Sequence, residues 1–505
     1  MTKNKIGRWV LILLLAGLLP GLACQAAASP PDTKATPANQ GSGQIINTDS
    51  PTQIDTPGNQ ISIPISGTGG EEDTPGVATA QPGSIQTPGS DSEQPAVLPV
   101  NVDFQPVRIV QELKDFMPVG HNVGKVLVVE NPNPGLAIMD TRCQLTGYDS
   151  NGAVLDLSQC SIDLLLPGER RTIFESFFPQ SKTPVAKLEF TITQQGQPAQ
   201  TSLTTQSLST ERVKYWAKDG RVTGMVKNSS SYLINDLVTI ALLYDAQGQI
   251  IGVGTGASGG FAVPNGLSAV SVGVPSDLEP ARVELAAATP TRWAISSVSG
   301  SQPPLQVDEM QGYQIANTIE PQADVIFLAT NPNMDTSVND ARYQVAAYDA
   351  QGFVLGTWNY LSPIIFPGEQ MALESGTFPI PPDSTIASVE VQVNPLLEKA
   401  DRLDYGALGI KENPLKAVAG EYKDGSETFI LKNNWKNQIN NAEVLIVVYD
   451  ADGKIVGYGY NSIGPVPALG QINGTVWLSV LDNNFSGKPA KVKLFAHASR
   501  PEDIQ

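Results

Sequence analysis

Histidine is almost absent from the 505-residue chain, which has two histidines, His121 and His497, and three cysteines. Ordinary zinc sites need clusters of these residue types, so we expect no metal of this kind. Charged residues make up 16% of the chain, against roughly 25% in a typical soluble protein. Positive charge is the scarcer sign, because 32 lysines and arginines stand against 50 acidic residues and leave a net charge of −18. Nucleic acid would be repelled by such a chain and is not expected as a partner.

Motifs for catalysis are also missing. Residues 256–260 read Gly-Ala-Ser-Gly-Gly, which fits the string of the nucleophile elbow, but no helix is predicted after Ser258 and both histidines lie elsewhere in the chain. Residues 450–453 read Asp-Ala-Asp-Gly and begin like a calcium loop, yet the glutamate that closes the ligand pattern is absent, so we interpret them as a hairpin turn. No phosphate-binding glycine loop opens a helix. We therefore predict that the chain is not an enzyme and needs no cofactor.

A single long apolar run is present near the start of the chain. It extends from Val10 to Leu19 behind the basic residues Lys3, Lys5 and Arg8. This is about half the length that a membrane-spanning helix needs, so it is typical of an export signal. The run leads into Gly-Leu-Ala-Cys at 21–24, which resembles the lipobox of bacterial lipoproteins.

The lipobox resemblance implies a signal peptide at 1–23, a lipid on Cys24 and an extracytoplasmic protein anchored to the cell membrane. An ordinary secretory signal or an uncleaved anchor remains the alternative. Residues 24–100 follow as a tether of Pro, Gly, Ser, Thr, Gln and Asn. Between residues 25 and 98 this tether has no aromatic residue, and such a segment buries too little apolar surface to fold. We expect a disordered spacer.

Internal repetition is the clearest pattern in the remaining sequence. One series is spaced by 200 residues: Asn131-Pro132-Asn133 and Asn331-Pro332-Asn333, Tyr148-Asp149 and Tyr348-Asp349, Gly152 and Gly352, Pro167-Gly168-Glu169 and Pro367-Gly368-Glu369. A second series is spaced by 205 residues: Lys227-Asn228 and Lys432-Asn433, Tyr244-Asp245 and Tyr449-Asp450, Gly248 and Gly453. The two series interleave, so we predict an A-B-A′-B′ duplication with units at 101–200, 205–290, 303–398 and 403–499.

Each unit repeats one order of elements: an apolar strand, an Asn-rich turn, a strand ending in Tyr-Asp, an Asp-x-x-Gly turn and a further strand. Short strands separated by turn residues indicate an all-β sandwich. The segment Ala241-Leu242-Leu243-Tyr244-Asp245 is similar to the motif of the FxLYD family of bacterial envelope proteins. This resemblance implies four tandem immunoglobulin-like β-sandwiches outside the cytoplasm, and it implies no activity.

The other two cysteines, Cys143 and Cys160, lie on the two sides of the predicted turn at 149–152. A two-residue turn at Asn151-Gly152 places them directly opposite each other, within reach of a disulfide. A type I turn with a glycine bulge shifts the register by one residue, and the match then needs a further bulge. We predict a structural disulfide, with two buried free thiols as the alternative.

Two aromatic residues in Asn-rich loops are candidates for ligand binding. Trp435 lies in Lys-Asn-Asn-Trp-Lys-Asn-Gln at 432–438, and Tyr232 follows Asn228-Ser229-Ser230-Ser231. An aromatic face among amide groups suits a sugar, whereas either ring could instead fold onto its own core.

These observations predict a non-catalytic, lipid-anchored cell-envelope protein that displays or spaces β-sandwich modules for an envelope protein or glycan. The alternative is a carbohydrate- or solute-binding lipoprotein for uptake or wall attachment. The sequence does not identify the partner.

Overall fold

Short antiparallel strands make up the computed structural model of the chain. It describes residues 44–45, 96–97, 103–116, 123–179, 183–256, 260–289, 295–298, 305–315, 320–396, 402–403, 410–481, 488–498 and 503–504. None of these residues lies in an α-helix, and accordingly no helix among them is long and apolar enough to cross a membrane. An all-β fold of antiparallel sheets is therefore confirmed. The described residues all belong to one compact unit, Gly41–Gln505.

The predicted signal peptide, the lipid-attachment residue Cys24, His121 and Ser258 lie outside the described residues. Most of the predicted tether lies outside them too. Two of its stretches are strands: β1 (Gln44–Ile45) pairs with a strand near residue 313, and β2 (Ala96–Val97) pairs with a strand near residue 199.

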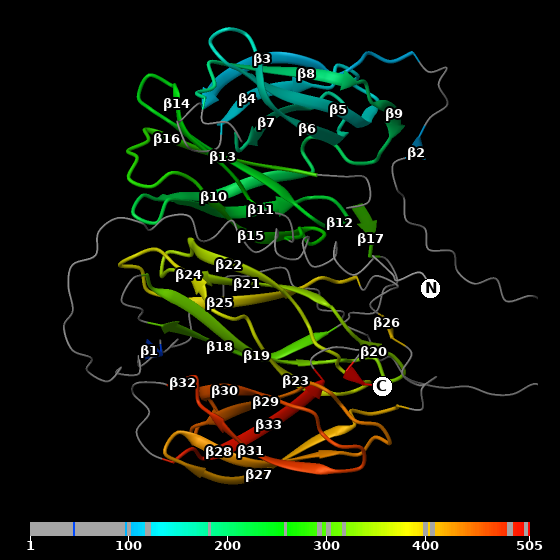
Figure 1. The fold of residues 1–505 in the computed structure, drawn as a ribbon, viewed down its shortest axis with the longest axis vertical. Helices are drawn as coiled ribbons and strands as arrows, with labels where there is room; N and C mark the ends of the chain where they lie inside the picture. Colours follow the sequence, from blue (N-terminus) through cyan, green and yellow to red (C-terminus); the bar gives the residue numbers. More distant parts are fainter. Residues whose placement is uncertain are drawn as a thin grey trace, which may run out of the picture. The chain divides into compact units, whose positions relative to one another are not determined.

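The larger sheets face each other in four pairs, whose strands are labelled in Figure 1. Sheet pair one joins β3 (Arg108–Phe116), β4 (Val123–Glu130) and β7 (Arg170–Phe177) to β9 (Gln197–Gln200), β5 (Ala137–Tyr148), β6 (Val154–Leu165) and β8 (Lys187–Gln194). Sheet pair two joins β10 (Leu208–Trp216), β11 (Arg221–Asn228) and β15 (Gly266–Gly273) to β14 (Ile250–Gly256), β13 (Val238–Tyr244) and β16 (Arg282–Ala288).

The third and fourth pairs repeat this plan. Sheet pair three joins β18 (Gln306–Ile315), β19 (Gln322–Thr330), β23 (Gln370–Glu374) and β24 (Phe378–Pro379) to β22 (Val354–Leu361), β21 (Arg342–Tyr348) and β25 (Ser388–Val393). Sheet pair four joins β27 (Leu415–Lys423), β28 (Ser426–Asn433) and β31 (Gln471–Trp477) to β32 (Val480–Leu481), β30 (Ile455–Ile463), β29 (Ala442–Tyr449) and β33 (Lys491–Ala498). Two short ribbons are separate: β12 (Tyr232–Ile234) with β17 (Ile295–Ser297), and β20 (Ser337–Val338) with β26 (Arg402–Leu403).

A separate hydrophobic cluster fills each sheet pair, as β-sandwich packing requires. In sheet pair four, Phe429 and Leu431 of β28 pack with Val444 and Ile446 of β29. Strand β28 alternates buried and more exposed residues, which is the period of a strand with one face on a core. Strand β19, in contrast, is buried along nearly its whole length, because its second face contacts another sheet.

The contacts between sheet pairs use equivalent strands each time. Val126 of β4 clusters with Leu242 of β13, and Met225 of β11 clusters with Ala346 of β21. Ile326 of β19 clusters with Val447 of β29. In each case the strand that precedes an Asn-rich turn packs against the Tyr-Asp strand of the next sheet pair.

The Tyr-Asp turn has the same hydrogen bonds in all four sheet pairs. The Asp149 carboxylate accepts bonds from the backbone N–H groups of Asn151 and Ala153, each at 2.8 Å. The aspartates of the other three turns accept the equivalent pair of bonds. The glycine that closes each turn has a φ between 76° and 81°, which a residue with a Cβ adopts only at a cost. One extra residue then bulges from the second strand in every copy.

A buried asparagine ends the equivalent strand in every sheet pair: Asn131, Asn228, Asn331 and Asn433, each at most 1% exposed. The Asn433 Nδ2 donates to the carbonyl oxygens of Asn437, Val466 and Pro467, and its Oδ1 accepts the N–H of Trp435 at 2.8 Å. The other three asparagines bond their own turn and a segment about 34 residues downstream in the same way.

Replacing Asn433 with alanine is expected to lower the free energy of unfolding by about 3 kcal/mol, because buried carbonyl and N–H groups lose their partners. Urea unfolding followed by tryptophan fluorescence measures the change. Asn434 is exposed and is the matched control, so Asn434→Ala should change stability by less than about 0.5 kcal/mol. Equal effects of the two substitutions would contradict the role given to Asn433.

Candidate functional site

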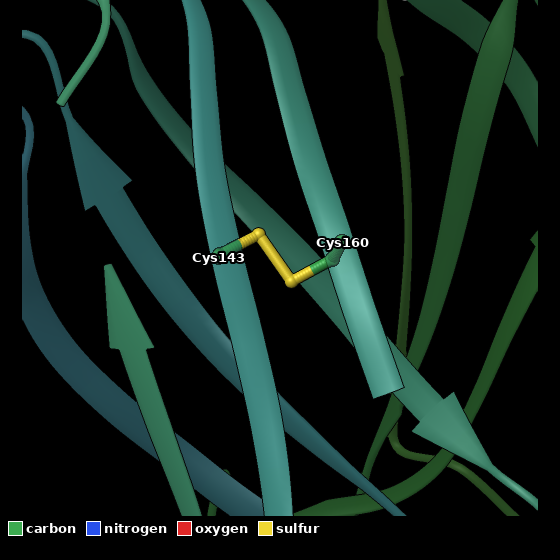
Figure 2. The surroundings of a disulfide bond; sticks show 2 residues. All are labelled: Cys143 and Cys160. Atoms are coloured by element: carbon green, nitrogen blue, oxygen red, sulfur yellow. A yellow bond between two sulfur atoms is a disulfide. The ribbon is translucent and has the colours of Figure 1, made fainter. Parts of the chain in front are cut away.

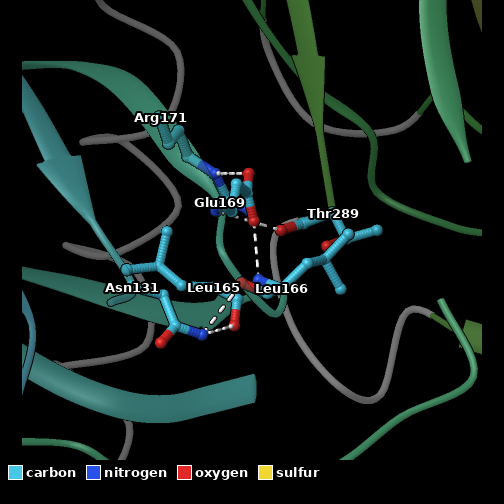
Figure 3. A network of polar contacts seen from close by, with 6 residues as sticks. All are labelled: Asn131, Leu165, Leu166, Glu169, Arg171 and Thr289. Carbon is cyan, nitrogen blue, oxygen red and sulfur yellow. Dashed lines mark hydrogen bonds and ion pairs between the residues drawn. The ribbon is translucent and has the colours of Figure 1, made fainter. Parts of the chain in front are cut away.

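The Pro-Gly-Glu turn of sheet pair one carries a network of polar contacts, shown in Figure 3. The Glu169 carboxylate accepts the backbone N–H of Leu166 at 2.6 Å. Arg171 donates to both oxygens of Glu169, at 2.7 and 2.9 Å. Its guanidinium also donates to the backbone oxygen of Thr289, at 3.3 Å, at the end of β16 in sheet pair two. Both side chains of this ion pair are largely buried. The bond from Arg171 to Thr289 therefore joins sheet pair one to sheet pair two at a buried position.

The equivalent turn of sheet pair three is built differently. Glu369 accepts the backbone N–H of Phe366 at 2.8 Å, and the Asn413 side chain donates to its other oxygen at 2.6 Å. Met371 stands where Arg171 stands in the first copy, so no arginine pairs with this carboxylate. Burial therefore raises the pKa of Glu369 to about 7. The repeated Glu169 and Glu369 were visible in the sequence, whereas their different partners were not.

The two cysteines of sheet pair one form a disulfide, shown in Figure 2. Cys143 lies directly opposite Cys160, with their Cα atoms 4.9 Å apart. The turn at 149–152 is the type I turn with a positive-φ glycine, and a bulge follows it, because Tyr148 pairs with Val154 while Gly147 pairs with Asp156. This second bulge restores the register that the turn alone would shift.

The two candidate aromatic residues lie against hydrophobic clusters. Trp435 is half-buried on the core of its own sheet pair, with the Lys436 ammonium 5.2 Å from its ring centroid. Tyr232 is half-buried against a cluster that contains Met139 and Leu164 of sheet pair one. The structure does not bring the two rings into one pocket or cluster of the described residues. Their predicted role in ligand binding stays a prediction.

Histidine occurs once in the described part of the chain. His497 is buried on β33, and its Nε2 lies 3.3 Å from a Glu443 oxygen. Within the described ranges, no group of three or more His, Cys, Asp or Glu side chains is arranged to hold a metal ion. Asp450, which begins the calcium-like string, accepts the N–H groups of Asp452 and Lys454 in its hairpin turn.

Together the fold and these contacts define an all-β protein of small antiparallel sheets whose recurring polar side chains bond the backbone. No protein-family model and no curated protein matches the chain. Among solved structures, it aligns with the crystal structure of Salmonella alpha-2-macroglobulin reacted with methylamine at 9% identity and a TM-score of 0.11. That alignment covers 79% of this chain and 40% of the other, so the chain spans less than half of that structure. A TM-score this low carries no argument.

Reducing the disulfide is expected to destabilise sheet pair one by about 3 kcal/mol, because a loop of this size gains entropy in the unfolded chain. The sequence separation of the two cysteines is 17 residues. The measurement is thermal unfolding of Cys143→Ser/Cys160→Ser against the unreduced chain, with Cys24→Ser as the matched control. An unchanged melting temperature in the double variant would contradict a stabilising bond.

The stability of the chain should fall as pH rises from 5 to 8, and Glu369→Gln should reduce this fall. The pKa of Glu369 is about 7 in the folded state and about 4.3 in the unfolded state. Between about pH 4.3 and pH 7 the folded state therefore binds a proton that the unfolded state does not. The stabilisation that this proton gives declines as pH rises and is lost above about pH 7. The effect of this one group is on the order of 2–3 kcal/mol. Denaturant unfolding at several pH values measures the slope. Glu169→Gln, which breaks the Arg171 pair, should lower stability at every pH, and an unchanged slope for Glu369→Gln would refute the assignment.

Proposed function

We propose that the chain is a non-catalytic, lipid-anchored protein of a bacterial cell envelope that displays or spaces β-sandwich modules. The four sheet pairs are its modules, and the proposal includes the A-B-A′-B′ duplication and the FxLYD-like, immunoglobulin-like class. Residues 24–100 act as the tether between the membrane and these modules. The modules act on an envelope protein or a glycan by binding, and the membrane is reached through the lipid on Cys24.

The observation that carries this proposal is how the repeated polar residues are used. Asn131 and its three counterparts bond backbone groups inside the fold, and so do Asp149 and its counterparts. A repeated residue that serves catalysis leaves a polar atom facing a substrate. Repetition here instead preserves one module four times, which is what a protein built for display or spacing requires.

The site residues support a non-catalytic protein in a second way. The described histidine, His497, lies beside Glu443, and its pairing strand carries no serine or cysteine opposite it. Binding of glycan through Trp435 is the alternative function, and the packing of this ring on its own core leaves only part of its face for a sugar. Among the described residues, no contact favours that alternative over binding of a protein.

Lipid attachment is the testable core of the proposal. In a bacterial host that expresses the full chain with labelled palmitate, the wild type should carry the label and partition into the membrane fraction. Cys24→Ser removes the acceptor thiol, so both the label and the membrane partition should be lost. Cys143→Ser removes a different thiol and should keep the label. Label retained on Cys24→Ser would exclude the anchor.

A further inference from the structure

A cleft of about 370 Å³ opens where sheet pair one meets sheet pair two. Its lining mixes polar residues with aliphatic ones: Ile162 and Ile173, which also pack in the core of sheet pair one, and Ile240 and Ala286 of sheet pair two. This volume is within the range of small-molecule sites, which are mostly apolar with a few polar groups. The cleft lies beside the Glu169–Arg171 ion pair, which also contributes to its lining.

Glu175 of β7 is the unusual residue in this lining. Among the described residues, no side chain or backbone group bonds its carboxylate. Burial alone raises the pKa of Glu175 to about 7, so the charged form is costly at this position. A cation seated beside this carboxylate would offset that cost.

The cations that the structure describes beside Glu175 do not neutralise its carboxylate, because each of them already has an acidic partner. Lys125 lies opposite Glu175 on β4, but its ammonium is 2.6 Å from Glu112 and 3.0 Å from Asp115. The other charged lining residues pair as follows: Arg171 with Glu169, Arg170 with Glu130, and Glu284 with Arg282 and the Tyr244 hydroxyl. Asp163 adds a further carboxylate to the lining.

The junction of sheet pairs three and four corresponds to that of sheet pairs one and two. Comparing the two junctions shows which residues leave room for the cleft. Ala286 faces Ile240 across β16 and β13, whereas Phe495 faces Leu445 at the corresponding position of β33 and β29. Ala288 likewise corresponds to His497, and Glu175 corresponds to Ser375, which is fully buried. Small alanines and an unpaired glutamate therefore occur together in one copy, while bulky side chains and a bonded serine occur together in the other.

We infer that this cleft binds a small organic cation with an aliphatic body, of the alkylammonium class. Its ammonium group bonds the Glu175 carboxylate, and its hydrocarbon covers Ile162, Ile240 and Ala286. The protein contributes the apolar wall and the negative charge, and no covalent step is involved. This binding site is independent of the anchor and the display role proposed above.

Hexylammonium is the probe for a test on the full chain at pH 8, where Glu175 is charged and the amine is protonated. Saturation-transfer NMR and calorimetry should detect binding. Hexanol, which has the same body without the charge, should bind at least tenfold more weakly, because it lacks the charge-assisted bond. Hexanoate should not bind.

Two variants test separately the charge of Glu175 and the volume of the cleft. Glu175→Gln keeps the volume and should weaken hexylammonium binding by tenfold or more. Ala286→Phe introduces the residue of the second copy and should abolish binding of hexylammonium and hexanol alike. Glu189→Gln changes a partly exposed carboxylate outside the cleft and should leave the affinity unchanged. Melting curves check that each variant folds.

Equal affinity of wild type and Glu175→Gln for hexylammonium would overturn the inference. So would the absence of binding to the wild type, or hexanoate binding as tightly as hexylammonium. If Ala286→Phe fails to fold, the comparison of Glu175→Gln with Glu189→Gln decides the question alone.

Discussion

The buried asparagine at the end of each Asn-turn strand is the contact on which the rest of every sheet pair depends. Asn331, for example, donates to Thr336, Ile365 and Phe366 and accepts from the backbone of Asn333. One side chain thus fixes the turn that follows its own strand and the end of a segment from the opposite sheet. An amide suits this position because it carries donors and an acceptor without a charge, so burial costs little once all are bonded.

The sequence predicted much of this arrangement because the repeats are local. Spacing and alternation indicated short strands, and the Asp-x-x-Gly string indicated the turns, which the structure confirms at Asp149 and Gly152. The Asn-rich segments were recognisable as turns for the same reason. That Asn131 is buried and bonds Leu165 and Leu166 could not be read from the sequence, because those partners lie far along the chain and carry no signature of their own.

The register of paired strands and the bonding partners of buried side chains could not be predicted from the sequence. Two turn types fitted the Cys143–Cys160 hairpin. The observed turn needs a bulge at Leu155, which no residue type in the sequence indicates. At the junctions, Glu169 and Glu369 looked equivalent, yet Arg171 and Met371 two residues later give them opposite surroundings. The cleft beside Glu175 depends on the small side chain of Ala286. That this side chain leaves space can be inferred only when the strand opposite it is known. Each of these features is set by contacts across sheets.

The outward side chains of the Tyr-Asp strands show how contact between sheet pairs shapes the repeat. In sheet pair two these positions hold Ile240 and Leu242, which pack against Val126 of sheet pair one. The corresponding positions of sheet pair one hold Gln144 and Thr146, and no hydrophobic cluster of the described residues includes them. There the Gln144 side chain donates to the Thr146 hydroxyl at 2.8 Å, so sheet pair one keeps the strand and carries a polar pair at these positions. The hydrogen bonds within each sheet pair are therefore alike while the faces between sheet pairs differ, which is why the motifs predict the sheet pairs better than their junctions.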